Sequence, residues 1–173
     1  HARLDYDDLI LTSLQLLQRQ AGIAGWVLFK LDEGLDHVLI DEAQDTNPEQ
    51  WEVVRILAEE FFIDAGRHAD KPRTIFAVGD AKQSIYSFQR ADPEKFAEMR
   101  RYFRERAREI EADWREVPMN ISFRSTDAVL GTVDRVFAGA VAKQGVGDEG
   151  DDVAHSPFRV GQAGRIELWP AVE

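Results

Sequence analysis

The sequence contains no cysteine, and this absence removes several classes of protein at once. Without thiols there is neither a disulfide framework nor a thiolate-bound metal site, which fits the reducing cytoplasm. No apolar run approaches the roughly 20 residues that a membrane-spanning helix needs. No signal-peptide pattern opens the chain either. These absences predict a cytoplasmic protein without a membrane partner.

Positive charge is also scarce, since 21 Lys and Arg stand against 32 Asp and Glu, for a net charge of −11. This balance argues against a protein that coats nucleic acid through its overall charge. A local basic track remains open, because the field in a groove depends on how the charges are distributed. Residues 95–108 carry six basic and only two acidic side chains. Taken alone, this segment favours a solvated helix face over a binding track.

The length of 173 residues suffices for one good core, or for one domain and the start of another. A hydrophobic fraction of 44% and a charged fraction of 31% are typical of a globular protein in water. The chain begins at His1 rather than at Met, so we expect it to be part of a longer protein.

Helices are predicted where apolar residues repeat at intervals of three and four behind a capping residue. Four such segments begin at Asp5, at Asn47-Pro48, at Asp92-Pro93 and at Ser125. The side chains expected to face inward are Ile10, Leu14 and Leu17; Trp51, Val54, Leu57 or Ala58, and Phe61; Phe96, Met99, Phe103, Ala107 and Ile110; and Val129, Val133 and Val136.

Two short segments, 37–41 and 73–80, are continuously apolar until they end in acids. Strands of this kind, separated by amphipathic helices, predict an α/β fold whose parallel sheet is covered by helices on both faces. A third strand is expected at 114–121, despite the proline inside it, and a closing strand at 164–170. Glycines and acids make 139–157 an expected exposed loop.

The first of these strands runs directly into two adjacent carboxylates, in the sequence HVLIDEAQDT at 37–46. Neighbouring acids repel each other unless a cation or a proton transfer uses them. In open parallel sheets, ligands bind beyond the carboxyl ends of the strands. There Asp41 can hold Mg²⁺ while Glu42 takes a proton from an attacking water. An ordinary acidic loop is the structural alternative for this pair.

Three motifs follow one another in order: IDEAQDT at 40–46, VGDAKQSIYSFQRAD at 78–92 and SFRST at 122–126. Together with YDDLI at 6–10, they resemble the UvrD-like DNA helicases of superfamily one. Within that family the resemblance is strongest to the AddA type, the helicase–nuclease subunit of bacterial double-strand-break repair. It extends over residues 5–138.

The resemblance implies parts of two RecA-like P-loop NTPase domains. Residues 1–112 would be the later part of the first domain, and residues 113–173 the beginning of the second. The cofactors implied are ATP and Mg²⁺. The implied partners are single-stranded or double-stranded DNA and a second subunit, as in an AddAB-type complex.

Five residues receive a role in ATP hydrolysis from the resemblance. Asp41 would coordinate Mg²⁺, and Glu42 would be the base that activates water. Gln44 would help to couple the state of the nucleotide to the rest of the site. Gln83 would contact the γ-phosphate, and Arg124 would reach it from the second domain, where a guanidinium neutralises developing charge. Outside its motif, Arg124 would be taken for a surface salt bridge.

Three further residues receive a role in DNA binding. Tyr86 and Phe88 would be aromatics on which bases stack, a contact that tolerates any base sequence. Without the motif, Phe88 would be taken for a core residue. Arg90 stands where members of the family often carry glycine, and it would either contact a phosphate or point to solvent. Because Gln83 and Tyr86 are three residues apart, one segment would touch both ATP and DNA.

No phosphate-binding loop of the form G-x-x-x-x-G-K-[ST] occurs in the chain. The family carries this loop upstream of the acidic motif, so we expect an internal part of an ATP-dependent helicase that acts in double-strand-break repair and recombination. Two alternatives remain open. One is a non-catalytic interaction domain with a helicase-like fold, and the other is a metal-dependent nuclease built on Asp41, Glu42 and Asp45.

Overall fold

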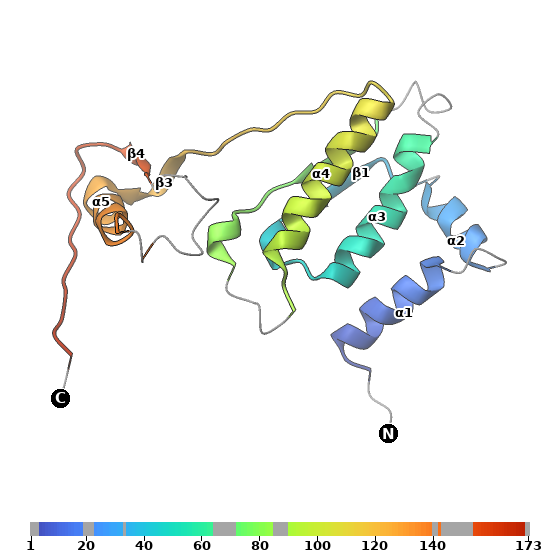
Figure 1. Ribbon diagram of the computed structural model, residues 1–173, viewed down its shortest axis with the longest axis horizontal. Helices are drawn as coiled ribbons and strands as arrows, with labels where there is room; N and C mark the ends of the chain where they lie inside the picture. Colours follow the sequence, from blue (N-terminus) through green and yellow to red (C-terminus); the bar gives the residue numbers. More distant parts are fainter. Residues whose placement is uncertain are drawn as a thin grey trace. The chain divides into compact units, whose positions relative to one another are not determined.

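The computed structural model describes residues 4–18, 23–32, 34–63, 72–84, 90–139, 142 and 154–171. The chain divides into two compact units, His1–Trp114 and Arg115–Glu173. In the described residues, each unit contains one two-stranded parallel sheet, with four α-helices in the first unit and one in the second (Figure 1). The predicted α/β class with parallel strands is therefore confirmed.

The first unit contains most of the regular structure. In chain order its elements are α1 (Tyr6–Gln18), α2 (Ile23–Asp32), β1 (His37–Ile40), the 3₁₀ turn η1 (Ala43–Asp45), α3 (Pro48–Ile63), β2 (Thr74–Ala77), the 3₁₀ turn η2 (Ala81–Gln83) and α4 (Pro93–Glu109). Strands β1 and β2 pair in parallel, with His37 opposite Thr74 and Ile40 opposite Ala77. Helix α2 was not predicted, because its apolar residues show no helical period.

Helices α3 and α4 begin where their capping residues predicted that a helix would start. At the start of α3, the amide of Gln50 donates to Oδ1 of Asn47 at 2.8 Å, and the amide of Asn47 donates to Oε1 of Gln50 at 2.9 Å. At the start of α4, Oδ1 of Asp92 accepts from the amides of Glu94 and Lys95. Each cap satisfies backbone donors that the first turn leaves unpaired.

Helices α3 and α4 lie side by side and cover one face of the sheet (Figure 1). Their inward side chains form the core with Ala43, and the fully or nearly fully buried members are Trp51, Ala58, Met99 and Phe103. Ile40 and Ile75 pack against this core from the sheet. Ala58 is completely buried, whereas Leu57 is only half-buried, which decides between the two predicted positions.

The other face of the sheet is bare in the described part of the chain. Leu39 of β1 is 73% exposed and Phe76 of β2 is 57% exposed, and both alternate with the inward Ile40 and Ile75. The helical cover expected on both faces is therefore seen on one face only. Parallel sheets are usually buried on both sides.

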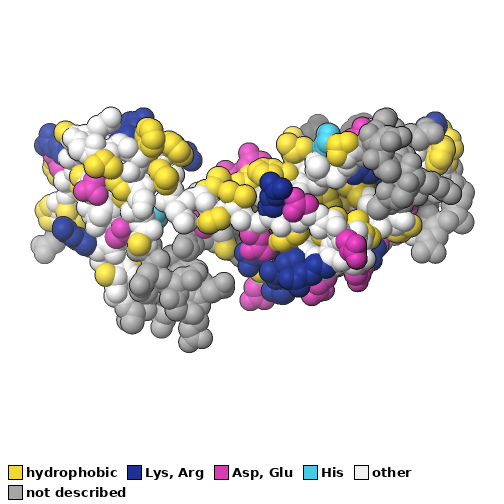
Figure 2. Space-filling view, turned by 90° about the horizontal axis from the view of Figure 1, so that it is seen from above, with side chains coloured by type: hydrophobic (Ala, Val, Ile, Leu, Met, Phe, Trp, Pro, Cys, Tyr) yellow, Lys and Arg dark blue, Asp and Glu magenta, His cyan; other side chains and the backbone are white. Residues whose placement is uncertain are grey.

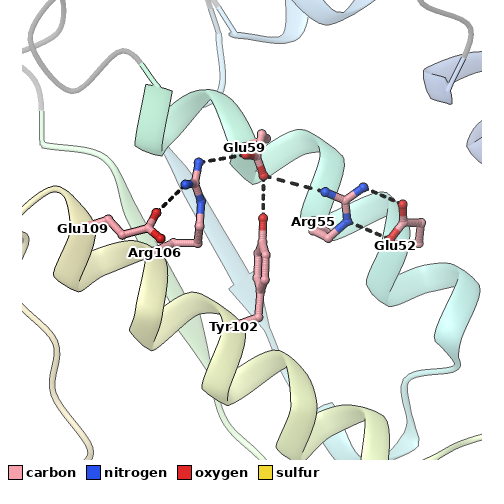
Figure 3. A network of polar contacts seen from close by, with 6 residues as sticks. All are labelled: Glu52, Arg55, Glu59, Tyr102, Arg106 and Glu109. Atoms are coloured by element: carbon pink, nitrogen blue, oxygen red, sulfur yellow. Dashed lines mark hydrogen bonds and ion pairs between the residues drawn. The ribbon is translucent and has the colours of Figure 1, made fainter.

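A polar network fastens α4 to α3 beside the core (Figure 3). Glu59 of α3 accepts from the hydroxyl of Tyr102 at 2.6 Å and pairs with Arg106 at 2.8 Å, both on α4. Arg55 lies 3.8 Å from the same carboxylate and binds Glu52 at 2.6 Å. The hydrogen bond from Arg55 lowers the pKa of Glu52. Burial, followed by the hydrogen bond to Glu59, raises the pKa of Tyr102.

The second unit contains β3 (Ile121–Thr126), α5 (Asp127–Val136) and β4 (Ser156–Arg159). The strands pair in parallel, with Ile121 opposite Ser156 and a register irregularity before Thr126 meets Arg159. The strand predicted at 114–121 is wrong, since residues 112–120 have no regular structure. Pro118 has no N–H to give to a ladder, and the strand begins only after it.

Two further predictions in this unit are wrong. Helix α5 begins after Thr126, and Ser125, the predicted cap, is part of β3. The predicted closing strand at 164–170 has no secondary structure, and Leu168 within it is 98% exposed. The second strand lies instead at Ser156–Arg159 and overlaps the last two residues of the predicted loop 139–157, most of which lies outside the described residues; Gly161 with φ 76° follows the strand. Alternating apolar residues mark a strand only where a partner and a core receive them.

Candidate nucleotide-binding site

The parallel register brings together the loops that follow β1 and β2. The amide of Val78 donates to the carbonyl of Ile40 at 2.9 Å, and the amide of Ala43 donates to the carbonyl of Val78 at 2.9 Å. The loop at residues 41–46 is thereby hydrogen-bonded to the segment at residues 78–84, at the carboxyl edge of the sheet. Two of the three motifs meet where α/β folds bind their ligands.

Asp41 and Glu42 are both exposed at this edge. The backbone of Glu42 adopts the left-handed region, with φ 49°, and its amide donates to Oδ1 of Asp41 at 2.9 Å. A glutamate in that region costs about 1 kcal/mol relative to ordinary helical or extended backbone. Among the described residues, none donates to Oδ2 of Asp41. The turn therefore presents two acids to solvent with one oxygen of Asp41 open, a donor that suits Mg²⁺.

Gln44 stands behind this pair and is only 1% exposed. Its Nε2 donates to Oε2 of Glu42 at 2.8 Å and more weakly to Oδ2 of Asp45 at 3.4 Å. Its Oε1 accepts from the amide of Asp80 at 2.9 Å. The side chain thus bridges the loop after β1 and the loop after β2, a position that the sequence alone did not indicate.

Gly79 makes this bridge possible. A Cβ at that position would fall 2.6 Å from Oε1 of Gln44 and 3.0 Å from the amide nitrogen of Ala43. The contact with Gln44 is too short for any real Cβ, so the amide of Gln44 would have to move, and the backbone at Ala43 would have to give by a few tenths of an ångström. Glycine is therefore required here by close approach, not by an unusual φ.

Gln83 closes the second loop at the end of η2. It is exposed, and its Nε2 donates to Oδ2 of Asp80 at 3.1 Å. The hydroxyl of Ser84 contacts the carbonyl of Gln44 at 3.4 Å. The structure therefore joins Glu42, Gln44, Asp80 and Gln83 in one chain of hydrogen bonds. Sequence reasoning noted Asp80 as a strand-ending acid but gave it no role.

The residues predicted to bind DNA are placed only in part. Tyr86 and Phe88 lie outside the described residues. Arg90 adopts a left-handed backbone, with φ 68°, and its half-exposed guanidinium pairs with Glu49 in the first turn of α3. Glycine adopts this φ more readily than arginine, which fits the glycine that the family resemblance implies at this position.

Arg124, the arginine predicted to reach the nucleotide, belongs to the second unit. It lies in β3, and its side chain is exposed. Its predicted role remains a prediction.

The basic segment of α4 is largely a solvated and paired helix face. Lys95 binds Glu98 at 2.7 Å, and Arg106 binds both Glu59 and Glu109. Figure 2 shows a cluster of Lys and Arg side chains that is bordered by Asp and Glu side chains. The segment therefore does not form an uninterrupted cationic track among the described residues.

Clustered metal ligands are absent from the part of the chain that the structure describes. In that part, no three His, Asp or Glu side chains are grouped so that they could hold a metal ion. The nuclease alternative on Asp41, Glu42 and Asp45 required acids that converge in this way. Within the same residues, no helix has the length and apolar character needed to cross a bilayer.

Residues 1–104 match the UvrD/REP helicase N-terminal domain. The match covers more than half of the chain, so the chain belongs to the UvrD/REP helicase family. This membership confirms the resemblance seen in the motifs.

Individual relatives share one description, that of AddA, a subunit of an ATP-dependent helicase/nuclease. The AddA protein of Lactobacillus helveticus (strain DPC 4571) is 32% identical over 134 residues, which are 78% of this chain and 10% of that protein. Its namesakes from Staphylococcus haemolyticus (strain JCSC1435) and Staphylococcus aureus (strain JH9) are each 31% identical, again over 78% of this chain. The chain spans 10% of the length of these relatives.

Proposed function

We propose that this chain supplies the water-activating half of an ATP-driven DNA helicase of the AddA type. One observation carries the proposal. The exposed pair Asp41 and Glu42 ends a parallel strand, and hydrogen bonds fix it to the neighbouring loop that holds Gln83. Both loops lie within residues 1–104, which match the UvrD/REP helicase N-terminal domain.

The proposed chemistry divides the work between four side chains. Asp41 would hold Mg²⁺, which neutralises charge on the phosphates of ATP. Glu42 would accept the proton of the attacking water, a role worth about 10²–10⁴ in rate. Gln83 would donate to the γ-phosphate, since an amide offers hydrogen bonds without a fixed charge. Arg124 would approach the same group from the second RecA-like domain.

The proposed use of this energy is movement along DNA. Tyr86 and Phe88 follow Gln83 closely in sequence, so stacked bases and the γ-phosphate would be touched by one short segment. Arg90 would reach a DNA phosphate only after exchanging its contact with Glu49. A second subunit, double-strand-break repair and a cytoplasmic location come with the AddA type and belong to the same proposal.

The bare face of the sheet supports a larger parent domain. Leu39 and Phe76 would be covered by further elements of the first RecA-like domain, because an exposed apolar face of a parallel sheet is costly. The phosphate-binding loop, which this chain lacks, would lie among those elements. The isolated chain is therefore expected to hydrolyse ATP negligibly.

The test is ATP hydrolysis by the full-length parent with and without single-stranded DNA. Glu42→Gln is expected to lower kcat by about 10²-fold or more while ATP binding is retained. Glu105→Gln, on the exposed side of α4, is the matched control and should leave kcat unchanged. Full activity of Glu42→Gln would contradict the proposal. A parent without any G-x-x-x-x-G-K-[ST] loop would favour the non-catalytic interaction domain instead.

A further inference from the structure

We infer that Gln44 is a positioning residue that holds the proposed base Glu42 and the proposed γ-phosphate contact Gln83 in one unit. The inference rests on the proposed function and deepens it. Gln44 would act through these neighbours and not by touching the nucleotide.

The side-chain amide of Gln44 is buried and hydrogen-bonded at both ends, and this points to a positioning role. Gln44 is 1% exposed, and both ends of its amide are engaged by the protein. A buried amide whose donor and acceptor are both engaged is held in place, and its 1% exposure leaves little of it accessible to a ligand. Its purpose must therefore lie in the groups that it binds.

The first of these groups is the carboxylate of Glu42. This residue sits on an exposed left-handed turn, where a long side chain would otherwise sample several rotamers. The donor Nε2 of Gln44 engages Oε2 at 2.8 Å. Within the described residues, Oε1 of Glu42 receives no hydrogen bond and is left for water. A base held by one oxygen is oriented before the reaction, as efficient proton transfer requires.

The second group is the loop after β2. Oε1 of Gln44 accepts from the amide of Asp80, and Oδ2 of Asp80 accepts from Gln83. A displacement of Gln83 by the γ-phosphate would therefore pass to Glu42 through two side chains. The proposed base Glu42 and the proposed γ-phosphate contact Gln83 would therefore move together.

Gly79 provides an independent handle on the same contact. Its missing Cβ is what admits Oε1 of Gln44, at 2.6 Å from the position that a Cβ would occupy. Gly79→Ala is therefore expected to displace Gln44 without changing any functional group of the site.

The experiment compares three variants in two readouts. Gln44→Met keeps the length of the side chain but removes both hydrogen bonds, whereas Gln44→Glu keeps the acceptor for Asp80 and loses the donor to Glu42. The first readout is the exchange rate of the Asp80 amide in the 173-residue chain, followed by NMR. We expect Gln44→Met to accelerate it about tenfold, and Gln44→Glu to change it less. Gly79→Ala should accelerate it as well.

The second readout is the ATPase activity of the parent. Gln44→Met is expected to lower kcat by about 10–100-fold with KM for ATP changed by less than about threefold. Gln44→Glu should lower kcat as strongly, because the base has lost its donor. The double variant Gln44→Met/Gly79→Ala should be no worse than the single variants, since both break one contact. Gln50→Met, which removes the bond that its Oε1 accepts from the amide of Asn47 at the start of α3, is the matched control and should keep kcat.

The outcomes separate this inference from the proposed function. Unchanged exchange at Asp80 in Gln44→Met would overturn the bridge itself. A normal kcat in Gln44→Met, in a parent that Glu42→Gln inactivates, would overturn the positioning role and leave the proposed function standing. A normal kcat in Glu42→Gln would remove the base, and the positioning role with it. If Gln44→Met fails to fold, Gly79→Ala supplies both readouts.

Discussion

The two units use the same kinds of element but bury their side chains very differently. In the first unit, α3 and α4 close over the sheet and bury Trp51, Ala58 and Met99 almost completely. In the second unit, Leu130 is the only buried apolar residue among those that the structure describes. The rings of its strand residues Phe123 and Phe158 pack against each other with 4.9 Å between their centroids, yet both side chains are more than 60% exposed.

Hydrogen bonding alone therefore makes a strand but does not give it a core. In the described residues, the sheet of the second unit is paired over only a few positions and one helix, α5, packs on it, so its apolar side chains remain at the surface. Apolar side chains are visible at the surface of both units in Figure 2. A second layer, as α4 provides for α3, is what turns an apolar stripe into a stabilising core.

The largest expected effect contrasts two tryptophans. Trp51 is 1% exposed and stacks on Phe96 with 6.1 Å between the ring centroids. Trp51→Ala should therefore lower the free energy of unfolding by about 3–5 kcal/mol. Trp169 is 78% exposed, and Trp169→Ala should change stability by no more than about 0.5 kcal/mol. Urea denaturation followed by circular dichroism measures both. Equal effects of the two variants would refute the contrast between the units.

The same contrast explains what could be predicted of the fold. Helices α3 and α4 begin at Asn47-Pro48 and Asp92-Pro93, signals that are written in a few neighbouring residues and need no partner. The wrong strands at 114–121 and 164–170 were inferred from apolar residues that found no core. Whether such residues are buried depends on other elements, which a local pattern does not contain.

The candidate site divides in the same way. The acids Asp41 and Glu42 and their place after a strand could be inferred from the residue types and the end of an apolar run. The bridge made by Gln44 could not, because it depends on the parallel register that sets Gly79 against Ala43. That contact joins loops that are far apart in the sequence, and only the folded sheet creates it.

A second prediction concerns Gly164, which tests whether the sparse unit has any tightly fitted position. A Cβ there would lie 2.9 Å from Cβ of Ala128 and 3.3 Å from Cβ of Thr126, at the start of α5. Gly164→Ala should therefore destabilise the second unit by about 1–3 kcal/mol. Hydrogen exchange of residues 121–136 measures the loss. Unchanged exchange would mean that residues around 164 are not held against α5.

The third prediction probes the polar network beside the core of the first unit. Tyr102→Phe removes the hydroxyl that donates a hydrogen bond to Glu59. It should lower the free energy of unfolding by only about 1–2 kcal/mol at neutral pH, because Glu59 keeps its arginine partners. Tyr6→Phe is the matched control, because Tyr6 is 86% exposed, and should be neutral. Urea denaturation at pH 7 compares the two.

The same tyrosine gives a pH dependence with a defined sign. Its folded pKa lies above the ordinary value of 10.0, because burial and then the bond to Glu59 disfavour the ionised form. The contribution of Tyr102 to stability is therefore complete below pH 10 and is lost as the pH rises through the folded pKa. Tyr102→Phe should flatten the alkaline decline of the unfolding free energy, and Tyr6→Phe should not. An equally steep decline in Tyr102→Phe would contradict this assignment.

The smallest expected effect is a gain in stability, and it would make the second unit more like the first. Gly131 lies inside α5, and a Cβ added there would meet nothing within 4 Å. Gly131→Ala should therefore stabilise the second unit by about 0.5–1 kcal/mol, because alanine loses less backbone entropy in a helix and clashes with nothing. Slower hydrogen exchange along 127–136 would show the gain. If exchange instead accelerates, α5 packs against something at Gly131, and the second unit is less open than its exposed side chains indicate.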